Sequence, residues 1–201
     1  MLFKNLRVYR LPVGWGTSAF ELDEVLAKKP LRACGPHDAE ALGWIPPFAH
    51  YEDVFVWGSG NDLLICLGAE RKLLPKAVVD AEVDKRAATF EEQNGYRLGR
   101  KQRREVADQG TQEFLPRAFT RRSKTFAWID RTNGYLVVNA SSPAKAEEVL
   151  ELLRRTLDEF PLTLLRTELS PMSAMARWLA EGEAPAGFTI DQDCSLRSIS
   201  E

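Results

Sequence analysis

Arginine and lysine side chains gather in one short part of this sequence, residues 97–124. Nine cations stand there against three carboxylates, so the segment carries +6 while the rest of the 201-residue chain sums to −8. Guanidinium groups form paired hydrogen bonds with phosphate oxygens. Because charge is screened within about 10 Å, local rather than net charge decides how a polyanion is met. The segment therefore predicts a phosphate-binding surface. Its candidate residues are Arg97, Arg100, Lys101, Arg104, Arg117, Arg121 and Arg122.

The first four of these cations, from Arg97 to Arg104, are spaced at i, i+3, i+4 and i+7. In a helix they would share one face over about two turns, roughly 10 Å, and duplex DNA carries a phosphate charge every ~1.7 Å of its axis. Acids at helical spacing from Arg97, Arg100 and Lys101 are largely absent, whereas Arg104 has an i+4 partner in Asp108. The pattern favours contact with the DNA backbone, and no base-reading motif accompanies it.

In a second interpretation, the same cations bind no ligand. Charge runs on helices usually form solvated faces. Phe119 lies between Arg117 and Arg121 and, with the neighbouring helices, could form a surface that docks another protein. The two interpretations differ in salt dependence. Log affinity for DNA falls with log salt by about 0.9 per phosphate contact, whereas an apolar contact is nearly insensitive to salt.

Carboxylates near a predicted hairpin offer a third interpretation, a metal-dependent nuclease. Glu70 and Lys72 follow one strand of this hairpin, and Asp53 lies on the other. Two carboxylates and a lysine can hold Mg²⁺ and activate water. Such triplets are common by chance at charged strand ends. The sequence therefore favours a protein that is not an enzyme and that uses no metal or cofactor.

Strands and helices alternate along the chain. Apolar runs predict strands over residues 2–11, 51–57, 63–68 and 162–166, with another hairpin turning at Asn133-Gly134. Helical periodicity and capping residues predict helices that begin near Ser18 and Ser142, and others over residues 75–93, 99–114 and 171–181. Hairpins packed with helices indicate an α+β fold class.

Two of the predicted helices form an antiparallel helical hairpin, because they flank the turn signal Asn94-Gly95. Their apolar stripe is thin and their surface is highly charged, which favours an arm that projects from the body. We predict an α+β body over residues 1–74 and 123–201, with room for two sub-domains. A helical arm over residues 75–122 carries the basic stretch.

Composition excludes several classes of protein. The longest apolar runs are far shorter than the ~20 residues that span a bilayer, so no membrane partner is expected. Cys34, Cys66 and Cys194 are few and far apart. They do not form a disulfide framework, and a reducing cytoplasm is the simplest location. Cys34 and His37 lack a second pair of ligands, so zinc is not expected.

A series of short motifs runs along the whole chain in a characteristic order. They are Phe3-Lys4-Asn5-Leu6, Val8-Tyr9-Arg10-Leu11, Cys34-Gly35, Gly43-Trp44-Ile45-Pro46-Pro47, Lys72-Leu73-Leu74-Pro75, Leu115-Pro116-Arg117-Ala118-Phe119, Trp128-Ile129-Asp130 and Lys145-Ala146-Glu147. In this order and spacing they resemble the RdgC family of bacterial recombination-associated proteins. The family's chains are typically longer, and the resemblance is to their N-terminal two-thirds.

The resemblance implies a cytoplasmic, nucleoid-associated homodimer that closes into a ring. Family members bind duplex DNA with little sequence preference and restrain the RecA recombinase. The expected partners are therefore duplex DNA, single-stranded DNA as well, a second copy of the chain, and RecA directly or indirectly. By the same resemblance, the arm carries one of two dimer contacts, and Phe119 matches the aromatic residue at that contact. Arg117 falls on a position associated with the DNA-facing side.

Overall fold

The computed structural model describes residues 3–157 and 159–190. The chain divides into two compact units, residues 1–164 and 165–201. The first unit contains, in chain order, β1 (Leu6–Arg10), α1 (Ala19–Leu26), β2 (Glu40–Ile45), β3 (Val56–Ser59), β4 (Asp62–Leu73), α2 (Lys76–Asn94), α3 (Arg100–Phe114), the short 3-10 helix η1 (Leu115–Arg117), β5 (Phe119–Asp130), β6 (Tyr135–Asn139), α4 (Pro143–Thr156) and β7 (Thr163–Leu164). Helices combined with one antiparallel sheet confirm the predicted α+β class.

The strands of the described chain form a single sheet in the order β2-β4-β5-β6-β1-β7, with β3 also paired to β4. β3 pairs with residues 62–65 of β4 and β2 with residues 66–71, along the same edge of that strand. β5 occupies the other edge of β4 over its whole length. β6 pairs only with residues 127–130 of β5. Residues 119–124 of β5 therefore continue beyond β6, paired with residues 68–73 of β4, and we call this part the β4–β5 extension.

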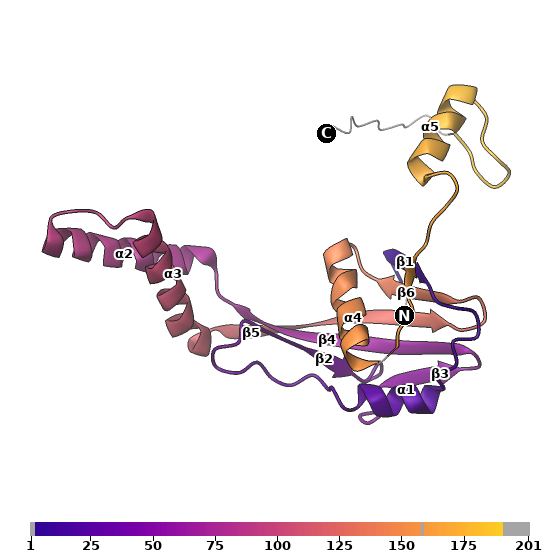
Figure 1. Ribbon diagram of the computed structural model, residues 1–201, viewed down its shortest axis with the longest axis horizontal. Coiled ribbons are helices and arrows are strands. Elements are labelled where there is room, and N and C mark those ends of the chain that lie inside the picture. The colour runs from indigo at the N-terminus through magenta and orange to yellow at the C-terminus, as the bar shows by residue number, and fades with distance from the viewer. Residues whose placement is uncertain (1–2, 158, 191–201) are drawn as a thin grey trace. The chain divides into compact units, whose positions relative to one another are not determined.

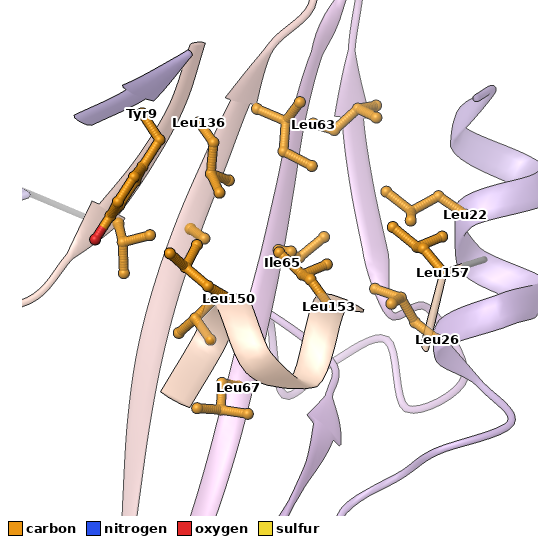
Figure 2. Close-up of a cluster of buried hydrophobic side chains, with 14 of the residues drawn as sticks. Tyr9, Leu22, Leu26, Leu63, Ile65, Leu67, Leu136, Leu150, Leu153 and Leu157 are labelled. Atoms are coloured by element: carbon orange, nitrogen blue, oxygen red, sulfur yellow. The ribbon is translucent and has the colours of Figure 1, made fainter. Parts of the chain in front are cut away.

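The hydrophobic core lies between one face of the sheet and the helices α1 and α4. Leu22 and Leu26 of α1 and Leu150 and Leu153 of α4 are completely or almost completely buried in one cluster with strand residues such as Ile65. Figure 2 shows these side chains pointing toward one another from the helices and the strands. Burial of a leucine contributes on the order of 2 kcal/mol, so this cluster sets the position of the sheet on which the arm is mounted.

Local signals place the two core helices. The Ser18 hydroxyl accepts the backbone N–H of Glu21 at 3.1 Å, and the Glu21 carboxylate accepts the backbone N–H of Ser18 at 2.8 Å. This is the predicted capping box. Ser142 caps α4 through the N–H of Lys145, and Pro143 occupies its first turn. Both helix starts agree with the sequence-based prediction.

The arm consists of α2, α3 and η1, which connect β4 to β5 (Figure 1). Gly95 ends α2 with φ at +77°, a conformation that glycine adopts without strain. Val79 and Val83 are the buried side chains of α2, and Leu115 is buried at the base of the arm. A thin apolar contact of this kind is what the charged sequence predicted.

Several boundaries differ from the prediction, and the strand β2 was not predicted. β3 begins at Val56 rather than at Tyr51, because the Asp23 carboxylate accepts the backbone N–H groups of Phe55 and Val56 and ties the preceding segment to α1. β4 continues to Leu73, and β5 begins at Phe119. Residues 119–122, assigned to the arm from the sequence, are therefore strand residues. The antiparallel ladder satisfies their backbone groups although the side chains that follow Phe119 are polar.

In its described part, the second unit consists of the helix α5 (Pro171–Glu181) and irregular chain without strands. Ser170 caps this helix through the N–H of Ser173, and Gly182 ends it with φ at +70°. The predicted helix over residues 171–181 is confirmed. Trp178 packs on Phe188 with their ring centres 5.1 Å apart. Among the described residues, no helix combines the length and the apolar character needed to cross a bilayer.

Candidate nucleic-acid interface

Arg100, Lys101 and Arg104 lie on the first two turns of α3 and are all exposed. Their spacing puts them on one face of the helix. Arg97 lies before the helix, in the loop that follows Gly95, because Gly99 is the N-cap residue. The predicted run of four cations on one helix face is therefore three residues on the helix and one beside its start. We call these four residues the α3 cluster.

The position of this cluster on α3 is electrostatically unusual. The N-terminal end of a helix carries a partial positive charge, so acidic side chains are favoured there and basic ones disfavoured. The first turn of α3 contains no acid, and Arg100 and Lys101 are its first two residues. The helix dipole and the side chains thus add their positive potentials at the same place. Such an end favours a bound anion.

Two members of the α3 cluster have acidic partners. Arg97 Nε lies 3.0 Å from Glu91 Oε1 on α2, and Lys101 Nζ lies 4.0 Å from Glu105 Oε1 on α3. The predicted pairing of Arg104 with Asp108 is not among the ion pairs of the described chain. The order of a base four residues before an acid is the less favourable one on a helix. Arg100 and Arg104 consequently remain without an ionic partner in the part of the chain that the structure describes.

The remaining predicted cations form a second group, the β5 cluster of Arg117, Arg121 and Arg122. Arg117 lies in η1, and the other two are consecutive residues of β5, so they point to opposite faces of the sheet. Arg121 is opposite Arg71 on the face that carries α4, where Arg71 is paired with Glu40 and Glu148. The sequence-based prediction of one continuous surface is therefore divided by the strand geometry.

Arg122 is held by a buried carboxylate. Its Nε donates to Glu70 Oε2 at 2.6 Å, and the backbone N–H of Cys34 donates to the other oxygen, Oε1, at 3.0 Å. The Arg122 side chain remains 70% exposed, whereas that of Glu70 is 5% exposed. The guanidinium first, and then the Cys34 N–H, hold the pKa of Glu70 below its ordinary value. Arg122 therefore faces solvent with part of its charge already neutralised.

The α3 and β5 clusters lie at opposite ends of α3. The helix has 15 residues, which corresponds to about 22 Å at 1.5 Å per residue. This distance is more than twice the screening length at physiological salt. Arg104, the α3-cluster residue nearest to the β5 cluster in the chain, lies ten residues before the end of the helix, about 15 Å. The two clusters are therefore separate groups of positive charge.

Lys72 and Lys124 belong with the β5 cluster, although the sequence did not predict them as phosphate-binding residues. Lys124 is two residues beyond Arg122 on β5, and Lys72 is two residues beyond Glu70 on β4, so all three cations share one face of the β4–β5 extension. The period-two spacing of Arg122 and Lys124 was the available signal. This signal was missed because the stretch lacks the alternation of apolar and polar residues that marks a strand.

Phe119 is the first residue of β5 and is 84% exposed. In the ladder it is opposite Leu73, which is also exposed and lies on the same face. These two side chains form a small exposed apolar surface at the end of the β4–β5 extension, beside Arg117 and Arg121. The arrangement is compatible with the predicted contact between two copies of the chain.

The residues of the nuclease interpretation do not converge. β3 pairs with β4 only as far as Ile65, and Asp53 precedes β3, so Asp53 is not paired with β4; the residue opposite Glu70 on that edge is Ala41 of β2. Both oxygens of Glu70 are occupied, by Arg122 and by Cys34. Within residues 3–157 and 159–190, no three His, Cys, Asp or Glu side chains are grouped to hold a metal ion.

Comparison with known proteins shows similarity along the whole chain. A family described as "Putative exonuclease, RdgC" matches residues 1–201. The recombination-associated protein RdgC of Dechloromonas aromatica (strain RCB) is 48% identical over 201 residues, which are 100% of this chain and 66% of that protein. The proteins of the same name from Herminiimonas arsenicoxydans and Janthinobacterium sp. (strain Marseille) are 44% and 43% identical over the same shares. The chain thus spans 66% of the length of these relatives, whose names indicate no catalysis.

Proposed function

Because the chain belongs to the RdgC family of recombination-associated proteins, as its motifs predicted, we propose that it binds DNA without sequence preference. In this proposal it acts in the nucleoid as a homodimer that encloses duplex DNA and restrains RecA-mediated recombination. The α3 cluster carries the proposal. Arg100 and Arg104 are exposed, have no ionic partner in the described chain and stand at the positive end of a helix.

The chemistry of these groups is that of backbone recognition. Guanidinium groups contact phosphate oxygens, and such contacts position a protein on DNA without reading its sequence. The α3 and β5 clusters, at opposite ends of α3, can contact the DNA backbone at two places. Release of counterions at each contact makes the affinity strongly dependent on salt.

Self-association in this proposal uses Phe119. An aromatic side chain that is 84% exposed gains most when a partner covers it, since buried aromatic residues dominate interface energies. The pairing of two such ends would place the cations of both copies around the same DNA. The enclosure of the duplex itself is taken from the family resemblance.

The test is a fluorescence-anisotropy titration of labelled duplex DNA over a range of salt concentrations. The double variant Arg100→Ala with Arg104→Ala is expected to lower the slope of log affinity against log salt by about 2, because each lost phosphate contact removes about 0.9. Arg154→Ala with Arg155→Ala on α4 is the matched control. It removes the same charge from two residues that already pair with Glu147 and Glu151. Equal slopes for the two double variants would contradict the proposal.

A protein-docking module without DNA is the competing interpretation of the same surface, and the same titration separates the two. A module of that kind would give no salt-dependent anisotropy change at all with the unmodified protein. The family description also calls for a nuclease assay. We expect end-labelled duplex to stay intact in Mg²⁺ or Mn²⁺. Shortening by the protein, but not by Glu70→Gln, would show that the nuclease interpretation is right.

A further inference from the structure

A row of apolar side chains crosses the sheet on the face opposite α1 and α4. The ladder registers place Val8 beside Val137, Val137 beside Trp128, Trp128 beside Leu64, and Leu64 beside Trp57. Paired residues share a face of the sheet, so these five side chains form one line over β1, β6, β5, β4 and β3. We call this line, with the apolar side chains next to it, the outer stripe.

The core helices leave this face uncovered. The core residues Leu63 and Ile65 of β4 point toward α1 and α4, so their neighbour Leu64 points the other way. Trp128 is 37% exposed, and Trp57 is 36% exposed although Phe48 and Tyr51 pack on its ring, whereas Val137 between its neighbours is 6% exposed. An antiparallel sheet with one face in water normally alternates apolar and polar residues. Here the strands are apolar on both faces, which is the pattern of a sheet that lies between two layers.

Further apolar residues widen the stripe, and a polar row ends it. Phe126 is opposite Cys66, and Cys66 is opposite Ile45, on the same face and one row further. On the other side the next row contains Arg10, Tyr135, Asp130 and Asp62. An apolar patch with a polar rim is characteristic of a surface that another element covers.

The size of the stripe argues against a separate partner. Five adjacent strands at about 4.8 Å spacing and two rows of residues give an area on the order of 300 Å². A stable interface between separate chains needs about 800 Å² on each partner. A segment of the same polypeptide needs less contact, because the connection raises its effective concentration to the millimolar range.

We propose that the outer stripe is the docking surface for the part of the family's chain that lies outside the matched region. The Dechloromonas relative has about 100 residues beyond the region that this chain matches. That segment would supply an apolar layer on Trp128, Leu64 and Val8 and complete a three-layer domain. The proposal is independent of DNA binding and of the Phe119 contact.

The first experiment mixes the 201-residue protein with the unmatched segment of the Dechloromonas relative, produced as a separate tagged polypeptide. Because the two polypeptides are no longer connected, a complex is expected only at high concentration, on the order of 1 mM, and titration calorimetry in that range measures it. Trp128→Lys should weaken the complex at least about tenfold, because a charge replaces a central aromatic contact. Phe20→Lys is the matched control: Phe20 is a highly exposed aromatic residue on α1, away from the outer stripe, and its replacement should have no effect.

The second experiment covers the case in which the separate segment does not fold. The segment is joined to the chain through a Gly/Ser linker, and maleimide labelling is followed at Leu6→Cys, with Phe20→Cys as the control. Leu6 is 55% exposed and shares the outer face with Val8. Labelling at Leu6→Cys should slow at least about tenfold in the fusion and stay unchanged at Phe20→Cys. Unchanged labelling at both positions would overturn the proposal. The proposal would also be overturned if the 201-residue protein without the fused segment forms a dimer that Trp128→Lys abolishes. A second copy of the chain would then occupy the stripe.

Discussion

The body and the arm of the first unit are held together by different forces. In the body, α1 and α4 bury large apolar side chains such as Leu22 and Leu153 against the sheet. In the arm, few apolar side chains are buried, and ion pairs join the helices: Arg86 with Glu113, and Arg103 with Asp84. An exposed ion pair contributes about 0–1 kcal/mol and weakens with salt. The stability of the arm should therefore depend more on ionic conditions than that of the body does.

The largest expected effect is on the body. Leu153 is completely buried, and Leu153→Ala should lower the free energy of unfolding by about 2–5 kcal/mol, because a cavity replaces the leucine side chain. Val83→Ala in the arm should cost clearly less, since solvent is close to the arm contact. Urea titration followed by circular dichroism measures both. Equal losses would mean that the arm is an integral part of the core.

The second largest effect is expected at the contact between two copies of the chain. Phe119→Ala is expected to raise the dissociation constant of self-association about tenfold, which corresponds to about 1.4 kcal/mol. Sedimentation velocity at several concentrations reads this directly. Phe20→Ala, which removes another highly exposed phenyl group, serves as the control. Coincident curves for Phe119→Ala and the unmodified protein would remove Phe119 from the contact.

The Glu70–Arg122 pair provides a pH test of the body. The pKa of Glu70 is lowered in the folded protein, so the carboxylate stabilises the fold above its unfolded pKa. This stability is lost as the pH falls through the folded pKa. Between about pH 5 and about pH 3 the unmodified protein should lose more stability than Glu70→Gln does. Glu24→Gln, an exposed acid on α1, controls for net charge. A parallel pH dependence of the unmodified protein and Glu70→Gln would show that the pair does not stabilise the fold.

The smallest expected effect tests whether acids of the arm compete with DNA. Glu91 pairs with Arg97, so Glu91→Gln should free that cation and raise DNA affinity about threefold at low salt. Glu92→Gln makes the same change of charge at the next residue, which forms no ion pair in the described chain. An equal gain in both variants would attribute the effect to net charge, and Arg97 would lose its place in the interface.

Local chemistry made much of the fold predictable. The Ser18 and Glu21 capping box, the Asn133-Gly134 turn with Gly134 at a φ of +71° and the helix over residues 171–181 were all found where the sequence indicated. Each depends on residues a few positions apart. Such signals keep their meaning in any tertiary context.

The candidate site was predictable only in part. The placement of Arg100 and Arg104 on one helix is confirmed, and it could be read from neighbours in the chain. The partner of Arg97 lies on α2, across the turn at Gly95, and the partner of Arg122 lies on another strand. No spacing rule reports a contact between residues that the fold alone brings together. The start of β5 at Phe119 was missed for the same reason, because pairing with β4 overrides a sequence without strand alternation.

The sequence by itself determined that positive charge is concentrated in residues 97–124, that the helices begin and end at their capping residues, and that the chain belongs to its family. Tertiary structure alone decided that Arg122 is neutralised by Glu70, that the cations form two clusters at opposite ends of α3, and that an apolar stripe crosses the outer face of the sheet. The physical reason is the range of the forces. Capping and helical spacing act within a few residues, whereas ion pairs and strand register depend on distances that exist only after the chain has folded.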